Sequence, residues 1–173
     1  AVPASATVVD ATGKWVSPGI VAGVSTLGVM EGYGMSEVND LSAGKSPFSA
    51  ALDISTAVNP NGQRIGTERS AGITRAFVIP STGNTMFAGQ GAVIDLGTDP
   101  DPVTRPRAFQ YIELGEDGMH AAGGSRPAAY ALLKAALGAA ANPASADFVS
   151  EDALITRQDA EALVPVLRGT QPL

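Results

Sequence analysis

The sequence contains no cysteine and a single histidine in 173 residues. Without cysteine the chain forms neither disulfides nor thiolate metal sites, and one imidazole does not build the multi-histidine centre of most metal-dependent hydrolases. The absence of cysteine identifies no compartment, because many exported and cytoplasmic bacterial proteins also lack it. By itself, the chain therefore excludes histidine-rich and thiolate metal sites.

Aromatic residues make up only 5% of the chain and charged residues only 16%, while hydrophobic residues make up 45%. An average domain carries roughly 25% charged residues, so the composition is that of a chain with a substantial core and not of a disordered one. With so few aromatics, that core consists of Ala, Val, Ile and Leu, the usual lining of parallel strands covered by helices. Length and composition predict one α/β domain.

Basic residues are also scarce, with 11 Lys and Arg against 17 Asp and Glu and a net charge of −6. Nucleic acids and anionic membranes require clustered basic surfaces, so neither is expected as a partner. No apolar run approaches the roughly 20 residues of a membrane span, and the start AVPASATVVD lacks a basic, then apolar, leader pattern. The compartment stays open between cytoplasmic and exported (periplasmic), and a removed leader remains an alternative.

Periodicity, turn residues and caps predict an alternation of strands and helices. Strands are expected over 7–9, 14–17, 20–29, 73–80, 89–97 and 108–115, and helices over 46–58, 63–71, 126–141 and 156–169. The nearly continuous apolar run 20–29 indicates a strand covered on both faces. A long loop follows over 31–45, and the Pro-rich stretch 97–107 is expected to be a connection. The order strand, helix, strand is the βαβ rhythm of a parallel sheet.

Three helix signals carry specific residues. Ser46 is expected to be an N-cap with Pro47 at the first helical position, and Thr156 to begin the last helix with Asp159 near the capping-box position. Pro165 falls inside that last helix and predicts a kink or an early stop.

Two blocks of sequence resemble the amidohydrolase superfamily. DATGKWVSPGIVAGVSTLGV is similar to the segment in which a β-sandwich strand leads into the first barrel strand, and SAGITRAFVIPSTGNTMFAGQGAVIDLG is similar to the imidazolonepropionase-like branch. The resemblance covers roughly the first hundred residues. It implies a partial (β/α)8 metallo-dependent-hydrolase-like TIM barrel over 18–173, preceded by a short N-terminal β-sandwich piece over 1–17.

The same resemblance locates a missing metal motif. The family reads approximately Asp-Ala-His-x-His where this chain has residues 22–26, so Val24 and Thr26 stand at the two histidine positions. Valine has no donor atom, and a neutral threonine hydroxyl is a poor zinc ligand. The family's other ligands lie on later barrel strands, so no metal, cofactor-binding or catalytic residue is expected in this chain. A divalent metal such as zinc belongs to the full-length family, and a single metal held by later strands remains the alternative to a degenerate site.

The last residues, RGTQPL, follow a helix with no strand after them. A sheet-covering helix is normally followed by the next strand, which favours a truncated domain; the alternative is a helix that closes the domain. An incomplete barrel would expose strand edges and apolar helix faces. We therefore expect self-association, with the remainder of its own barrel or a homo-oligomer as partner.

Several polar residues follow the predicted barrel strands, on the side where barrel enzymes place their active sites. Candidate ligand contacts are Glu31, Ser81, Thr82 and Asn84, with Glu37 and Asp40 in the same long loop. Solvated loop carboxylates and ordinary turn chemistry are the alternatives. The Gly89-Gln90-Gly91 stretch is not a dinucleotide motif, because it precedes a strand.

His120 lies near Ser125 and Asp117, the residue types of a Ser-His-Asp hydrolase, yet no G-x-S-x-G surrounds the serine. A surface or turn histidine is the alternative. The GGSRP stretch from Gly123 could cradle an anion, or could simply cap a helix.

The leading hypothesis is a fragment of an amidohydrolase-like protein, inactive by itself, whose family hydrolyses C–N bonds of cyclic amides or peptides. The alternative is a non-enzymatic ligand-binding or assembly module.

Overall fold

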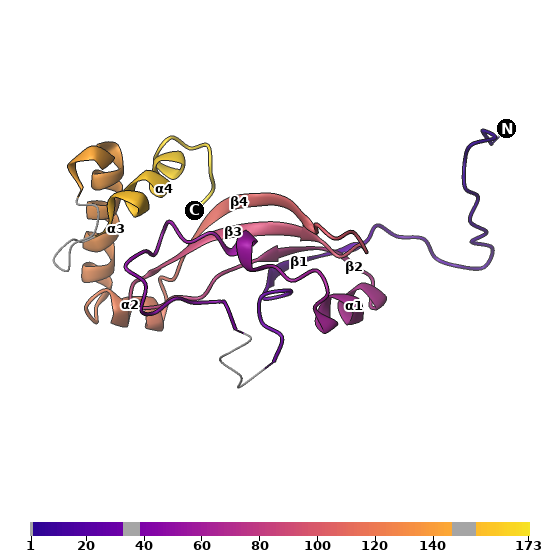
Figure 1. Cartoon of the computed structure of the whole chain (residues 1–173), viewed down its shortest axis with the longest axis horizontal. Helices are drawn as coiled ribbons and strands as arrows, with labels where there is room; N and C mark the ends of the chain where they lie inside the picture. The colour runs from indigo at the N-terminus through magenta and orange to yellow at the C-terminus, as the bar shows by residue number, and fades with distance from the viewer. Residues whose placement is uncertain (1, 33–38, 147–154) are drawn as a thin grey trace.

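The computed structural model describes residues 2–32, 39–146 and 155–173. Within these ranges it forms one four-stranded sheet in which the strands lie side by side in chain order (Figure 1). The strands are β1 (Ile20–Ser25), β2 (Ile73–Val78), β3 (Phe87–Asp95) and β4 (Val103–Ile112). The structure is thus mixed α/β.

The predicted strand, helix, strand unit is confirmed for the first two strands. β1 and β2 are parallel and are connected through α1 (Gln63–Ser70), whose end at Ala71 and Gly72, with φ +96°, is the predicted one. The sheet then departs from a parallel barrel, because β3 is antiparallel to β2 and β4 is antiparallel to β3. A parallel crossover needs a dozen or more residues, and the connections 79–86 and 96–102 are shorter than that.

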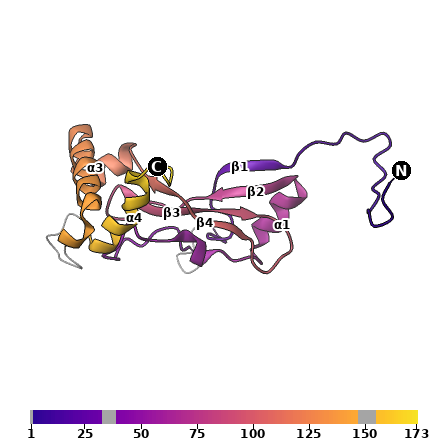
Figure 2. The ribbon, with the colours of Figure 1, turned by 90° about the horizontal axis from the view of Figure 1, so that it is seen from above.

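Three further helices lie at one end of the sheet (Figure 2). They are α2 (Glu116–Ala121), α3 (Arg126–Ala141) and α4 (Arg157–Leu167), with the short 3-10 turn η3 (Pro143–Ser145) between the last two. The predicted bounds of α3 and α4 are confirmed, and the backbone N–H of Ala128 donates to the Ser125 hydroxyl at 3.3 Å as a cap. The early stop expected at Pro165 is wrong, since α4 continues to Leu167. The helix α2 was not predicted.

The helix predicted over 46–58 is wrong. Residues in this stretch form turns and a 3-10 segment, η2 (Ile54–Ala57), and Ser46 accepts only a local hydrogen bond from the Phe48 N–H at 3.0 Å. The backbone pairs with β3 instead: the Gln90 N–H donates to the Leu52 carbonyl at 2.7 Å, and Asp53 and Gln90 form an isolated parallel β-bridge. These tertiary bonds replace the helical ones that local propensity favours.

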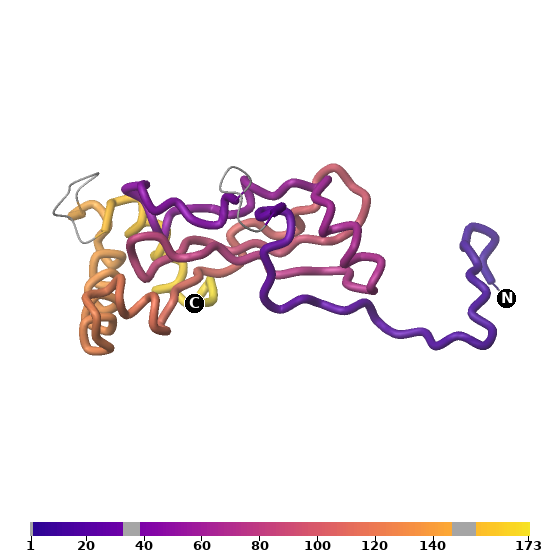
Figure 3. The backbone as a smooth tube through the Cα atoms, turned by 90° about the horizontal axis from the view of Figure 1, so that it is seen from below, coloured from indigo at the N-terminus to yellow at the C-terminus, as the bar shows by residue number. Residues whose placement is uncertain are grey.

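The strands predicted over 7–9 and 14–17 are absent from residues 2–19, which run away from the sheet as an extended segment (Figures 1 and 3). Only the turn between them has formed, with the Lys14 N–H donating to the Ala11 carbonyl at 2.9 Å. An isolated two-stranded hairpin is marginal in water, so these residues need a third strand or a surface to pair. The division into 1–17 and 18–173 stays a prediction.

The two faces of the sheet are covered unequally. One face packs against α1 and the segments 27–32 and 39–58 to form the first core cluster, which contains Leu27, Val29, Leu41, Ile54, Ile65, Ala76, Val78, Ala92, Ile94 and Leu96. The opposite face is exposed, as Val24 (72%) and Phe77 (36%) show. The prediction that β1 is an interior strand is therefore wrong for this chain: β1 lies at the edge of the sheet and one of its faces is open.

A second core cluster joins the helices to the start of β3, through Met86, Phe87 and small residues of α3 and α4. It is fastened by one buried carboxylate. Asp159 is 1% exposed, and its Oδ1 accepts hydrogen bonds from the N–H groups of Ser49 and Ala51 at 2.8 and 2.9 Å. Its Oδ2 accepts from the N–H and the hydroxyl of Thr156 at 3.2 and 2.8 Å, completing the predicted capping box. Four donors at a helix N-terminus offset the desolvation of this charge.

We predict that Asp159→Ala lowers the free energy of unfolding by about 3 kcal/mol, because buried N–H groups of the 49–51 segment lose their acceptor. The matched control is Glu161→Ala, an exposed position on the same helix, for which a change within about 0.5 kcal/mol is expected. Urea denaturation followed by circular dichroism measures both. Equal stabilities of the two variants would contradict the role of Asp159.

Candidate functional site

The two positions at which the resemblance places metal histidines lie in different surroundings. The pairing of β1 with β2 is irregular between Ala22 and Ser25, and Val24 there points to the open face of the sheet. Thr26 follows the strand, and its hydroxyl accepts a hydrogen bond from Arg64 Nη1 of α1 at 3.2 Å. A hydrocarbon and a hydroxyl bonded to a guanidinium thus stand where the sequence resemblance predicts imidazoles.

Glu31 is the candidate that follows this strand along the chain. It is half-buried beside Gly62, where even a methyl group would collide with the Glu31 carboxylate, and its Oε1 accepts no hydrogen bond within the described part of the chain. Burying an unbonded carboxylate oxygen is costly, so this group is a polar atom available to a ligand or a water. Glu37 lies outside the described residues, and Asp40 is exposed.

The candidates that follow β2 have structural contacts. The backbone N–H of Ser81 donates to the Leu41 carbonyl at 2.8 Å, and the Asn84 amide donates to the Gly44 carbonyl. Both residues line a small hollow of about 20 Å³, too small for any ligand beyond a water. Ser81 and Asn84 thus hold the 41–44 segment against the strand end. The Thr82 side chain makes no hydrogen bond to the described residues. Their role as ligand contacts stays a prediction.

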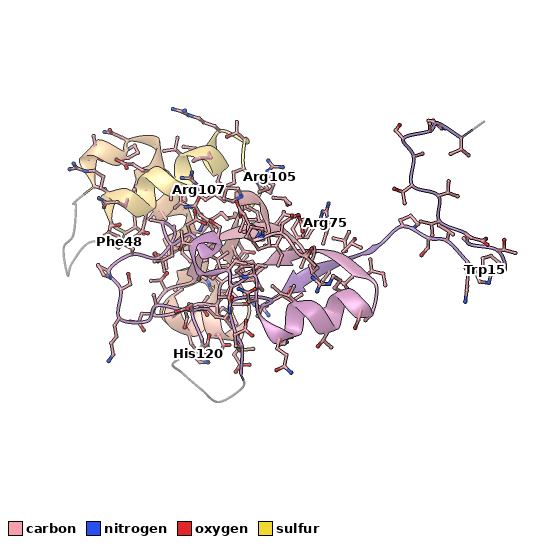
Figure 4. The ribbon with its side chains drawn as sticks, turned by 45° about the vertical axis from the view of Figure 1, so that its right-hand side comes forward. Trp15, Phe48, Arg75, Arg105, Arg107 and His120 are labelled. Carbon is pink, nitrogen blue, oxygen red and sulfur yellow. The ribbon has the colours of Figure 1, made fainter. Side chains whose placement is uncertain are left out.

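A large hollow lies elsewhere, on the open face of the sheet, and has a volume of about 710 Å³. Its floor is formed by Val24, Phe77, Ile79, Val93 and Phe109, with Arg105, Tyr111, Leu114, Pro172 and Leu173 at its edges. The Phe77 and Phe109 rings are 5.9 Å apart and tilted by 40°. Figure 4 shows Arg75 and Arg105 on the sheet. This site is apolar with a basic border, and its volume is that of a small-molecule pocket.

Sequence reasoning missed this hollow, although a signal for it was present. Ala76 and Val78 alternate with Arg75 and Phe77 along β2, and the first pair is buried while the second pair is exposed. Such alternation marks a strand with only one covered face, in contrast to the continuous apolar run of a strand that is covered twice.

The glycines beside Gln90 have a packing role. Gly89 has φ +127°, and a Cβ there would lie 2.7 Å from the Leu52 carbonyl oxygen. At Gly91 a Cβ would collide with the Phe109 ring, so this glycine lets the aromatic side chain lie flat on the sheet. The motif that resembles the family block therefore permits two close contacts: the 51–53 segment pairs with β3 beside Gly89, and the Phe109 ring lies against Gly91.

Beneath the 51–53 segment lies a cluster of buried glutamines, Gln90, Gln110 and Gln171, which are at most 9% exposed. The Gln171 amide donates to the Arg107 carbonyl at 2.8 Å, and the Gln110 amide donates to the Gly89 carbonyl at 3.1 Å. The carbonyl oxygens of Gln110 and Gln171 accept nothing from the described residues, and a buried water is the ordinary partner of such groups. The cluster ties the C-terminal residues to β3 and β4.

His120 does not form the imagined triad. It lies in α2 and not in a loop, is exposed, and its Nε2 is 3.9 Å from Glu116 Oε1. The Ser125 hydroxyl instead accepts a hydrogen bond from the Ala128 N–H at the start of α3. The GGSRP stretch therefore caps a helix, which was one of the two predicted roles. No hydrogen bond joins His120 to Ser125 among the residues that the structure describes.

Metal-ligating side chains do not gather anywhere in the described ranges: no three of His, Asp and Glu lie close enough together to hold an ion. Nor does any described helix have the length and apolarity to cross a membrane.

Comparison with known proteins supports the fold. No protein-family model matches the sequence, and no curated protein matches it. Among solved structures the chain is similar to an amidohydrolase from Thermotoga maritima MSB8, with a TM-score of 0.78 and 19% identity. The match covers 97% of this chain and 47% of that one, so the chain spans about half the length of the solved structure. The predicted amidohydrolase-like fold is thereby confirmed at the level of fold, while the imidazolonepropionase-like branch, the partial barrel and the β-sandwich piece stay predictions.

We predict that dilute protein enhances the fluorescence of an anionic apolar dye such as anilinonaphthalene sulfonate, because the hollow joins an apolar floor to Arg105. Phe77→Asp should reduce the enhancement several-fold, since it places a charge in the floor. Tyr130→Asp, at an exposed aromatic position on α3 (65% exposed), is the control and should change little. Equal dye binding by both variants would show that the hollow is not the binding surface.

Proposed function

We propose that the chain is one part of an amidohydrolase-like fold whose first metal-binding element has been lost, so that it does not carry metal-dependent C–N hydrolysis by itself. The observation that supports this is the contact between Arg64 Nη1 and Thr26 Oγ1 at 3.2 Å. A divalent ion held at Thr26 would lie close to a guanidinium. Like charges at about 4 Å repel by about 4 kcal/mol per pair of unit charges at an effective dielectric of about 20, and a divalent ion doubles that cost.

The donor set at this strand end does not fit the metal that the fold implies. Val24 offers no donor, and it faces the open hollow while Thr26 contacts α1. Glu31 is the one nearby carboxylate among the described residues with an unbonded oxygen, and a single carboxylate is not a zinc site. These residues therefore do not support a metal-dependent hydrolytic step. Activity of a longer protein, with ligands on further strands, stays a proposal that the partial match to the Thermotoga structure motivates.

A second candidate function is favoured by the hollow. Its volume of about 710 Å³ falls in the range of small-molecule sites, and its apolar floor with Arg105 at the edge suits an apolar molecule with an anionic group. This is the ligand-binding alternative to an enzyme. A thermal-shift screen against amino acids, dipeptides and cyclic amides tests for ligand binding, because a ligand of the native state raises the melting temperature by mass action. A flat screen would count against this function.

We predict less than a tenth of an equivalent of zinc per chain after equilibration with zinc and removal of the excess, as measured by elemental analysis. The triple variant Val24→His/Thr26→His/Arg64→Gln restores imidazoles and removes the nearby positive charge, and it should retain more zinc than the unmodified chain. A zinc protein of known stoichiometry, carried through the same steps, is the positive control of the assay. Tight binding of about one equivalent by the unmodified chain would refute the proposal.

A further inference from the structure

The turn that leads into α1 contains the dipeptide Asn61-Gly62. A backbone nitrogen that follows an asparagine can attack the side-chain carbonyl carbon and close a five-membered imide ring. Glycine in the second position favours this ring closure, because it has no side chain to obstruct the approach and its backbone is the most permissive. The dipeptide is therefore a candidate for a covalent change that needs no enzyme.

The other four asparagines of the sequence precede residues that oppose ring closure. Asn59 and Asn142 precede prolines, whose nitrogen carries no proton to give up. Asn84 precedes a threonine, and a β-branched side chain is stiff and hinders the approach. Asn39 precedes an aspartate, which is also bulkier than glycine. By sequence context alone, Asn61 is the most reactive of the five.

The structure leaves the Asn61 side chain available for this reaction. Asn61 is exposed, and its side chain takes part in no hydrogen bond within the described part of the chain. The side chains of Asn39 and Asn59 accept hydrogen bonds from backbone N–H groups at 3.1 and 3.0 Å, and the Asn84 amide donates to the Gly44 carbonyl. A bonded amide is fixed in place, whereas the Asn61 amide can turn toward the next nitrogen.

The attacking nitrogen is held by a single long hydrogen bond. The Gly62 N–H donates to the Asn59 carbonyl at 3.2 Å, which is the long end of the range for such bonds. This bond has to open before the nitrogen attacks. Asn59 and Asn61 are both exposed, so water replaces the lost partner at a small cost.

Gly62 is fitted closely against Glu31. An added Cβ would lie 3.1 Å from Glu31 Cδ and closer still to Glu31 Oε1, so the fold requires glycine at this position. Gly62 is also the N-cap residue of α1, whose first turns place Ile65, 2% exposed, in the first core cluster. The packing that requires glycine therefore also makes the start of α1 sensitive to a change in backbone length.

We propose that Asn61 is a site of spontaneous deamidation through an imide with Gly62. The Gly62 nitrogen bonds to Asn61 Cγ as the bond from Cγ to the amide nitrogen breaks, and the Gly62 N–H proton leaves with that nitrogen as ammonia. Water then opens the imide at either carbonyl and gives aspartate or isoaspartate. The reaction lies within one dipeptide and requires only water, so it depends on no free face of the sheet. It goes beyond the proposed loss of the metal-binding element and is independent of it.

Peptide mapping tests the site. The folded full chain is kept at mildly alkaline pH, because base removes the attacking N–H proton, and is digested with trypsin at intervals. We expect the peptide 46–64 to gain the mass of replacing NH2 by OH at Asn61, with isoaspartate as the larger product, several-fold faster than Asn39 or Asn84 reacts. No change at Asn61 in the folded chain while the urea-unfolded chain converts, or equal conversion at Asn84, would overturn the proposal.

Two variants separate the ring closure from other chemistry. Asn61→Gln cannot close a five-membered ring, so this variant should leave the peptide 46–64 unconverted over the same time. Asn84→Gln is the matched control and should leave conversion at Asn61 unchanged. Continued mass gain of the peptide 46–64 in Asn61→Gln would show that a different residue reacts.

The effect on α1 has its own measurement. An isoaspartyl link lengthens the backbone by one carbon and displaces Gly62 against Glu31, so the deamidated fraction, separated by ion exchange and rich in isoaspartate, should melt at a lower temperature than the fresh chain. Asn61→Asp adds the charge without the extra carbon, and a carboxylate is favourable near a helix N-terminus, so this variant should melt like the unmodified chain. Equal melting of the deamidated fraction and Asn61→Asp would contradict the effect on α1.

Discussion

The buried carboxylate of Asp159 adds hydrogen bonds to a contact between α4 and the 49–51 segment that is otherwise apolar. Its four hydrogen bonds close the first turn of α4 and hold the backbone at Ser49 and Ala51. That backbone in turn delivers the Leu52 carbonyl to the Gln90 N–H on β3. The position of the helical end relative to the sheet, and the coverage of one sheet face, therefore follow from satisfying a single buried charge.

The two faces of the sheet are covered unequally. The face toward α1 is a closed aliphatic core, whereas the opposite face has an apolar hollow with Arg105 among its lining residues. Residues 2–17 expose further apolar side chains, among them Trp15 and Val16. Burial of such apolar area is the main favourable term in association.

The chain is similar in fold to the Thermotoga amidohydrolase. The backbone is similar over nearly the whole chain at 19% identity. At the strand end where the sequence resemblance predicts a metal site, Val24 lies on the open face and Thr26 is bonded to Arg64. A similar fold does not imply the same reaction, because the reaction depends on the side chains at the site.

By itself, the sequence determined the features that depend on neighbours within a few residues. The capping box at Thr156, the end of α1 at Gly72 and the turn at Gly13 follow from local hydrogen bonds. The order strand, helix, strand from β1 to β2 follows from local periodicity, although the pairing of the two strands joins distant residues. Only the tertiary structure decided what becomes of segments with two compatible partners. Residues 46–58 form hydrogen bonds to β3 and not the predicted helix. β1 is an exposed edge strand, and residues 7–9 and 14–17 do not pair as strands. The physical reason is that strand pairing and burial are set by distant parts of the chain, which periodicity does not reveal.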